Sequence, residues 1–224
     1  QRGHDKPFFL GCGIFRPHLR WYAPQKYFDM HPLEDIELPA TLENDLDDIP
    51  PIARRQASGG AQAFGVIREH DEWKKAVQGY LASCSFADAC VGVVLDALEA
   101  SDHAKNTIVV LCGDHGFHLG EKDRISKLTL WEQGSKTPLI ISTPDLAETG
   151  GKRCSQPVSL VDLYPTLVEL SGLPERDGLD GRSIAPLLRD PETEWAYPAL
   201  ISLRNDHAVR SRDWHYIRYS DGSE

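Results

Sequence analysis

Two hydrophobic patterns along the chain predict its main elements. From Asp71 to Glu99, apolar side chains recur at three- and four-residue spacing, which predicts a long helix with Asp71 as its N-cap. The run Thr107–Cys112 is continuously apolar and rich in β-branched residues, which is typical of a strand buried on both faces. Further strands are predicted at Phe8–Cys12 and Pro138–Ser142, and a further helix at Ser159–Leu170.

A helix that leads into a buried strand is typical of an α/β fold. We expect the long helix to pack on the sheet through a right-handed connection, giving a mainly parallel sheet with helices on both faces. The proline-interrupted segment Tyr22–Gly65 is predicted to be a long irregular loop. After residue 195, three short strand candidates predict an antiparallel meander: Ala199–Leu203, His207–Arg212 and Trp214–Tyr219.

Composition and charge narrow the classes of partner. The chain of 224 residues is long enough for one buried core, and no apolar run approaches the roughly 20 residues that cross a bilayer, so no membrane span is expected. A net charge of −10 argues against a nucleic-acid partner, and a polyanionic substrate would need a locally positive pocket. The five cysteines form no Cys-x-x-Cys pair and are interpreted as buried free thiols. The acidic run Glu43–Asp48 lacks EF-hand spacing and is interpreted as a solvated face.

Polar residues that could bind a metal ion or take part in catalysis follow two of the predicted strands. Asp114 and His115 come directly after Thr107–Cys112, at the strand end where ligands bind in open α/β sheets. Their carboxylate and imidazole could supply part of a metal shell; the alternative is an aspartate that caps a turn beside a surface histidine. His18 follows the first predicted strand on a loop that Pro17 helps to fix, and it either joins the same crevice or faces solvent.

Several longer motifs, in order along the chain, resemble one known family. Gly113–Glu121, followed by Lys127, Leu130–Glu132 and Pro138–Ile141, is similar to the sulfatases, especially the iduronate-2-sulfatase-like branch of the alkaline-phosphatase-like superfamily. Three further stretches resemble the same family: Pro7–His18, Ser159–Leu167 and Leu179–Ser183. The resemblance implies an alkaline-phosphatase-like fold. Residues 1–195 would be the C-terminal portion of the sulfatase α/β domain, and residues 196–224 the beginning of its small antiparallel C-terminal subdomain.

The resemblance also implies roles for individual side chains. His18 and Lys127 would be catalytic and would bind the sulfate group or the leaving oxygen. Asp114 and His115 would bind a divalent cation, with Ca²⁺ favoured over Mg²⁺ or Mn²⁺. His118 is assigned to substrate binding, with a structural role as the alternative. Without the resemblance, a lone lysine in a charged loop, such as Lys127, would be interpreted as solvated.

One part of the family's machinery has no counterpart in this sequence. Family sulfatases attack with a cysteine or serine matured to formylglycine, in a Cys/Ser-x-Pro/Ala-x-Arg segment. No cysteine or serine here lies in such a segment, and the family's paired aspartates on its first strand are also absent. We therefore expect the formylglycine in a missing N-terminal segment of the same protein, which would be a partner of this chain. This polypeptide alone should then have little or no turnover.

The leading interpretation is a sulfuric ester hydrolase that acts on sulfated carbohydrates or other sulfate esters. Two alternatives stay open: a phosphate or phosphonate ester hydrolase of the same superfamily, and a relative that binds sulfated glycans without cleaving them. The sequence upstream of this chain would separate the enzyme from the binding module. Members of the family are commonly periplasmic, secreted or lysosomal, and this sequence does not indicate a compartment.

Overall fold

The computed structural model describes residues 6–224, which form two compact units. One unit comprises the chain up to Leu38 together with Asp71–Ala104. The other comprises Pro39–His70 together with Lys105–Glu224. Each unit therefore combines two segments that are distant in the sequence.

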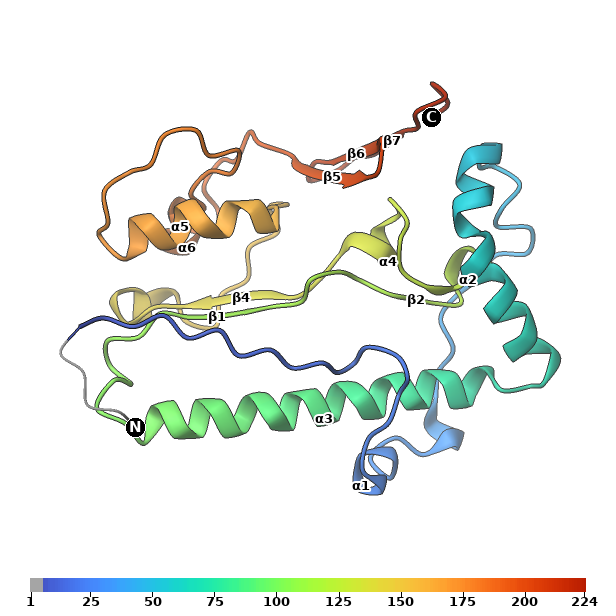
Figure 1. Cartoon of the computed structure of the whole chain (residues 1–224), viewed down its shortest axis with the longest axis horizontal. Coiled ribbons are helices and arrows are strands. Elements are labelled where there is room, and N and C mark those ends of the chain that lie inside the picture. The colour runs from blue at the N-terminus through green and yellow to red at the C-terminus, as the bar shows by residue number, and fades with distance from the viewer. Residues whose placement is uncertain (1–5) are drawn as a thin grey trace. The chain divides into compact units, whose positions relative to one another are not determined.

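The first unit is organised around α3 (Trp73–Glu99), the longest helix in Figure 1. The ring of Trp21 lies over Gly79 of this helix, only 3.4 Å from where an added Cβ would be. Two turns further along, Phe86 meets Tyr27 with ring centroids 5.3 Å apart. These aromatic contacts bury one face of α3. Two short helices precede α3 in this unit: α1 (Gln25–Phe28) and the 3-10 helix η1 (Leu33–Asp35).

The prediction of a long helix is confirmed, but its predicted N-cap is wrong. Glu72 occupies the N-cap without a side-chain hydrogen bond, and Asp71 has a φ of 54°, outside the helix. By length and composition alone, α3 could cross a membrane, a test that the core helix of a globular domain also passes. Near its C-terminal end, Val93, Val94 and Leu95 are exposed.

The strand predicted at Phe8–Cys12 is not formed. These residues have no regular secondary structure, and the side chain of Phe9 is 89% exposed. A strand needs a hydrogen-bonded neighbour, and the described part of this unit contains no other strand. Apolar patterning alone predicted the strand and could not supply that neighbour.

The second unit contains β1 (Val109–Cys112), which pairs with β4 (Leu139–Ser142). The pair is antiparallel, with Val109 opposite Ser142 and Cys112 opposite Leu139. Both strands are only half-buried or exposed, so burial on both faces is also wrong.

The mainly parallel sheet was a wrong prediction, since all strand pairs in residues 6–224 are antiparallel. Parallel strands need a crossover connection, usually a helix, and no helix longer than a single turn lies between β1 and β4. Between β1 and β4 the chain forms a small hairpin and two single helical turns. These elements are β2 (His118–Leu119), η2 (Glu121–Asp123), β3 (Ile125–Ser126) and α4 (Glu132–Ser135).

The segment predicted as a long loop contains most of a second helix, α2 (Pro51–Glu69). The Pro50-Pro51 pair suggested irregular structure, yet Pro51 lies in the first helical turn, where proline's missing N–H costs nothing. Ala53 of α2 packs in a buried cluster with Leu130, Ala208 and Tyr219. The helix therefore joins the core of the second unit.

The C-terminal elements follow their predictions closely. Ser159 and Asp162 form a capping box at the start of the helical segment that continues into α5, and Gly172 ends it with a φ of 63°. The predicted meander is confirmed as a three-stranded antiparallel sheet. The division between residues 195 and 196 stays a prediction. The elements are η3 (Pro144–Thr149), η4 (Leu160–Asp162), α5 (Leu163–Leu170), α6 (Ala185–Arg189), β5 (Ala199–Leu203), β6 (Asp206–Arg210) and β7 (His215–Arg218).

All five cysteines are free thiols, as predicted, but they are not all buried. Cys12, Cys112 and Cys154 are exposed, because the strands expected to bury the first two are absent or only half covered. Burial raises the pKa of the Cys84 thiol on α3.

Candidate functional site

The end of β1 presents Asp114 and His115 at the surface of the second unit. The Gly113 N–H donates to the carbonyl of Pro138, which continues the β1–β4 pairing by one step. The side chain of Asp114 is 90% exposed, and that of His115 is 30% exposed. Gly116 then lies against the backbone carbonyls of the α4 turn, where a Cβ would collide with them. A residue without a side chain is therefore required for this close approach.

Lys127 reaches His115 from the loop that follows β3. Its Nζ lies 2.8 Å from Nε2 of His115, while Nδ1 of the same ring lies 2.8 Å from the carbonyl oxygen of Gly116. A carbonyl only accepts, so Nδ1 carries the proton and Nε2 accepts from the ammonium group. The Asp114 carboxylate lies 3.6 Å from Nε2. The structure thus brings together three of the five predicted site residues.

These three side chains line a wide cavity of about 1500 Å³ in the second unit. That volume exceeds the roughly 300–1,000 Å³ of a typical small-ligand pocket, so the cavity is a broad trough. Among its lining residues, five cationic side chains face two carboxylates, although the whole chain carries a charge of −10. The local field therefore favours an anion. The charged lining residues are Asp114, Lys127, Glu132, Lys136, Lys152, Arg153 and Arg210.

The residues expected to bind a metal do not form a complete metal site by themselves. Asp114 and His115 supply two donors, and the Lys127 ammonium group lies against the imidazole nitrogen that would coordinate. Within residues 6–224, no cluster of three histidine, cysteine or acidic side chains could hold a cation. Calcium takes six to eight oxygen ligands, so these two donors fit only part of its shell.

His118 lies inside the protein and not at the surface of the trough. It is fully buried, its Nε2 is 2.8 Å from the Thr129 hydroxyl, and its Nδ1 is 3.2 Å from the carbonyl oxygen of Glu121. Burial, and then the positive charge of Arg124, lower the pKa of His118 to about 4. These contacts favour a structural role for His118, and its assignment to substrate binding stays a prediction.

His18 belongs to the first unit, and its convergence on the Asp114–His115 site stays a prediction. It is exposed on the loop after Pro17, with its ring 4.9 Å from that of Phe15. Nδ1 of His18 lies 2.7 Å from the carbonyl oxygen of Leu19. The Arg16 guanidinium donates to the His18 carbonyl at 3.2 Å, which helps to order this loop.

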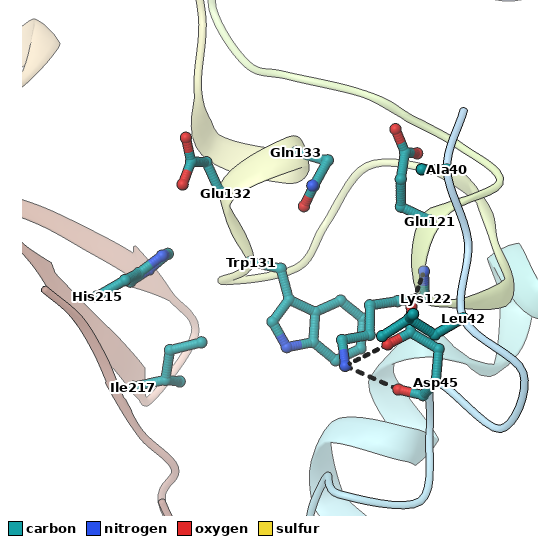
Figure 2. Close-up of a pocket in the computed structure, with 10 residues that line it drawn as sticks. All are labelled: Ala40, Leu42, Asp45, Glu121, Lys122, Trp131, Glu132, Gln133, His215 and Ile217. Atoms are coloured by element: carbon teal, nitrogen blue, oxygen red, sulfur yellow. Dashed lines mark hydrogen bonds and ion pairs between the residues drawn. The ribbon is translucent and has the colours of Figure 1, made fainter. Parts of the chain in front are cut away.

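Sequence patterning missed a smaller pocket of about 380 Å³ on the same unit (Figure 2). Its distinctive contact is Lys122, whose ammonium group lies 2.8 Å from a carboxylate oxygen of Asp45 and 3.2 Å from Asp48. The side chain of Asp45 is only 13% exposed, so the interpretation of the acidic run as a solvated face is wrong at this residue. No spacing rule links two partners that are 77 positions apart.

Carboxylates outnumber cationic groups around this pocket, since Asp45, Glu121 and Glu132 line it together with Lys122. Burial lowers the pKa of Lys122, but hydrogen bonds to Asp45 and Asp48 outweigh burial and raise it overall. Glu132 is paired with Lys136 at 3.2 Å. The pocket therefore lacks the excess positive charge of the trough.

Comparison with known proteins identifies relatives along the whole chain. The sulfatase family model matches residues 1–173. A sulfatase of Formosa agariphila is 41% identical over 226 residues, which cover 100% of this chain and 44% of that protein. Human iduronate 2-sulfatase is 31% identical, over 75% of this chain and 36% of its own length. The chain therefore spans less than half the length of these relatives.

Solved structures share its fold. The phosphonate monoester hydrolase of Agrobacterium radiobacter has a TM-score of 0.78 at 18% identity, covering 99% of this chain and 50% of that chain. This likeness confirms the prediction that the chain has the α/β fold of the sulfatases and alkaline-phosphatase-like hydrolases. The mainly parallel sheet is the part of that prediction that is not confirmed.

Proposed function

Because the chain belongs to the sulfatase family, we propose that it forms the sulfate-binding part of a sulfuric ester hydrolase acting on sulfated sugars or other sulfate esters. The observation that carries this proposal is the contact of Lys127 with His115, 2.8 Å apart, beside the exposed carboxylate of Asp114. The excess of cationic side chains around the trough supports an anionic ligand. The name of one relative, iduronate 2-sulfatase, supports a sulfated sugar as the substrate class.

In this proposal the side chains divide the work by their chemistry. Lys127 donates hydrogen bonds to a sulfate oxygen, and its positive charge stabilises the negative charge that grows there during transfer. His115 holds the ammonium group in place through Nε2. The role of His18 at the leaving oxygen stays a prediction from the family resemblance.

We propose that the cation is Ca²⁺ and that Asp114 supplies part of its shell; His115 joins this shell only if its Nε2 releases the Lys127 ammonium group, because its Nδ1 donates to the Gly116 carbonyl. The remaining oxygen ligands, like the formylglycine nucleophile, would come from a segment of the same protein outside this sequence. The lengths of the relatives support such a segment, because this chain matches only 44% of the Formosa sulfatase. Exposed apolar side chains such as Ile140 and Leu200 on the trough support a further covering segment.

Titration with inorganic sulfate tests the proposed anion site directly. Binding to the 224-residue chain is followed through the side-chain ¹⁵N signals of His115. Lys127→Met should weaken sulfate binding on the order of tenfold or more, because a hydrogen bond from a charged donor is lost. Lys105→Met removes the same charge from an exposed position outside the trough and should bind as the wild type does. Equal affinities for the two variants would refute the proposal.

A phosphonate ester hydrolase is the second candidate, favoured by the fold of the Agrobacterium enzyme. Parallel titrations with methylphosphonate and inorganic phosphate separate the two, since the sulfatase proposal requires that sulfate compete successfully at the same site. Incubation with 4-nitrophenyl sulfate should give no turnover by this chain. Hydrolysis at a rate typical of enzymes would show that a nucleophile is present after all.

A further inference from the structure

Arg124 is a buried cation in the second unit whose described contacts include no carboxylate. It lies between η2 and β3 and is 2% exposed. Its Nη2 donates to the carbonyl of Lys127 at 2.6 Å, and its Nη1 donates to the carbonyl of Gln56 on α2 at 3.4 Å. Its Nε has no hydrogen-bond partner among the described residues. Arginine is almost never fully buried unless paired, because desolvation of its charge is costly.

The helix α2 is shaped to receive this guanidinium group. At Gly60, an added Cβ would lie only 2.8 Å from Cζ, Nε and Nη2 of Arg124. That is about 0.7 Å short of the optimal separation of non-bonded atoms. Glycine inside a helix costs about 1 kcal/mol relative to alanine, and the contact with Arg124 explains why it is present here. A Cβ added at the adjacent Gly59 would have no heavy atom within 4 Å.

The contacts of Arg124 lead directly to the candidate anion site. Arg124 holds the backbone of Lys127, and the side chain of Lys127 in turn meets His115 at 2.8 Å. We propose that Arg124, seated on Gly60, is a positioning residue that holds Lys127 against His115 and so sets the affinity of the site for a sulfate group. This inference rests on the proposed function, which supplies sulfate as the ligand. Arg124 itself touches no substrate.

Arginine is suited to this task because its planar fork reaches two carbonyls at once. A lysine would keep the charge but would bind as a single point donor. Arg124→Lys should therefore move Lys127 while keeping the local positive field. Arg124→Gln removes both the fork and the charge. Comparing these two variants separates positioning from charge.

The test compares Gly60→Ala with Gly59→Ala, the same change at adjacent positions of one helix. Two quantities are measured for both glycine variants, for Arg124→Lys and for Arg124→Gln: the His115 side-chain ¹⁵N signals without ligand, and the dissociation constant for inorganic sulfate. Gly60→Ala and Arg124→Lys should shift the His115 signals and weaken sulfate binding about five- to tenfold, the size of one ordinary hydrogen bond, because Lys127 is displaced but not removed. Gly59→Ala should change neither quantity. Circular dichroism and thermal unfolding show that each variant is folded.

The possible outcomes distinguish this inference from the proposed function. Unchanged His115 signals and unchanged sulfate affinity in folded Gly60→Ala and Arg124→Lys proteins would overturn the positioning role. If the wild type itself binds no sulfate, the proposed function fails, and the His115 signals alone then decide whether Arg124 positions Lys127. If either Gly60→Ala or Arg124→Lys unfolds, the variant that remains folded still provides both measurements.

Discussion

Acidification should destabilise the second unit through His118, a fully buried histidine whose pKa is lowered to about 4. In the unfolded chain its pKa is near 6.5, so between these values the unfolded state binds a proton that the folded state excludes. His118 therefore makes its full contribution to the free energy of unfolding above about pH 6.5, and this contribution is lost as the pH falls toward 4. Carboxylates such as Asp206, whose pKa is also lowered in the fold, add their own loss in acid.

The size of the effect follows from the difference between the two pKa values. Each pH unit in this window is worth about 1.4 kcal/mol, so His118 should cost about 2 kcal/mol of stability at pH 5 and about 3 kcal/mol at pH 4. The physical cause is the cost of placing a charge in a dry interior beside the guanidinium of Arg124. A protein with a typical stability of 5–15 kcal/mol would register such a loss clearly.

Urea unfolding at several pH values between 7 and 4 measures this contribution. His118→Gln keeps a side chain that can hydrogen-bond with Thr129 but removes the titrating ring, so it corrects for the carboxylates. The variant should be less stable at pH 7, and its stability should fall less steeply with acid by about 2–3 kcal/mol over the window. Parallel pH dependences for wild type and variant would refute the reasoning.

Three further outcomes can be checked by unfolding measurements. Lys122→Met should cost about 1–3 kcal/mol, because the mostly buried carboxylate of Asp45 loses its charged partner and keeps only the backbone N–H of residue 122, whereas Lys136→Met, at an exposed pair, should change stability by less than about 1 kcal/mol. Leu130→Ala should cost about 2–5 kcal/mol because Leu130 is 1% exposed in the core, whereas Leu128→Ala, at a position 64% exposed, should cost less than about 0.5 kcal/mol. Calcium at 1 mM should raise the melting temperature of this chain very little, since two protein ligands bind it weakly; a large rise would show a complete site.

Elements with a strong local signal were predicted well. The apolar periodicity of Trp73–Glu99 is sufficient for a helix, and the alternating strands and turns after residue 195 are sufficient for a meander. The capping box of Ser159 and Asp162 is likewise encoded within four residues. The helix α2 was missed because two prolines were interpreted as breakers, although they stand where a helix can begin.

The candidate site shows the same division between local and distant information. The sequence identified Asp114 and His115 because a charged pair directly follows an apolar strand. It assigned Lys127 only through the family resemblance, and the structure then placed its ammonium group 2.8 Å from His115. His118 lies near them in the sequence, yet its side chain points into the core.

The sequence by itself determined the long helix Trp73–Glu99, the C-terminal meander and the short motif that carries the polar chemistry, because periodicity, caps and turn residues act over a few neighbouring positions. Only the tertiary structure decided that β1 and β4 run antiparallel, that Lys122 is held by Asp45, and that Arg124 rests on Gly60. These contacts join residues tens of positions apart. Their free energy depends on burial and on distances between atoms, and a linear pattern of residue types does not contain either quantity.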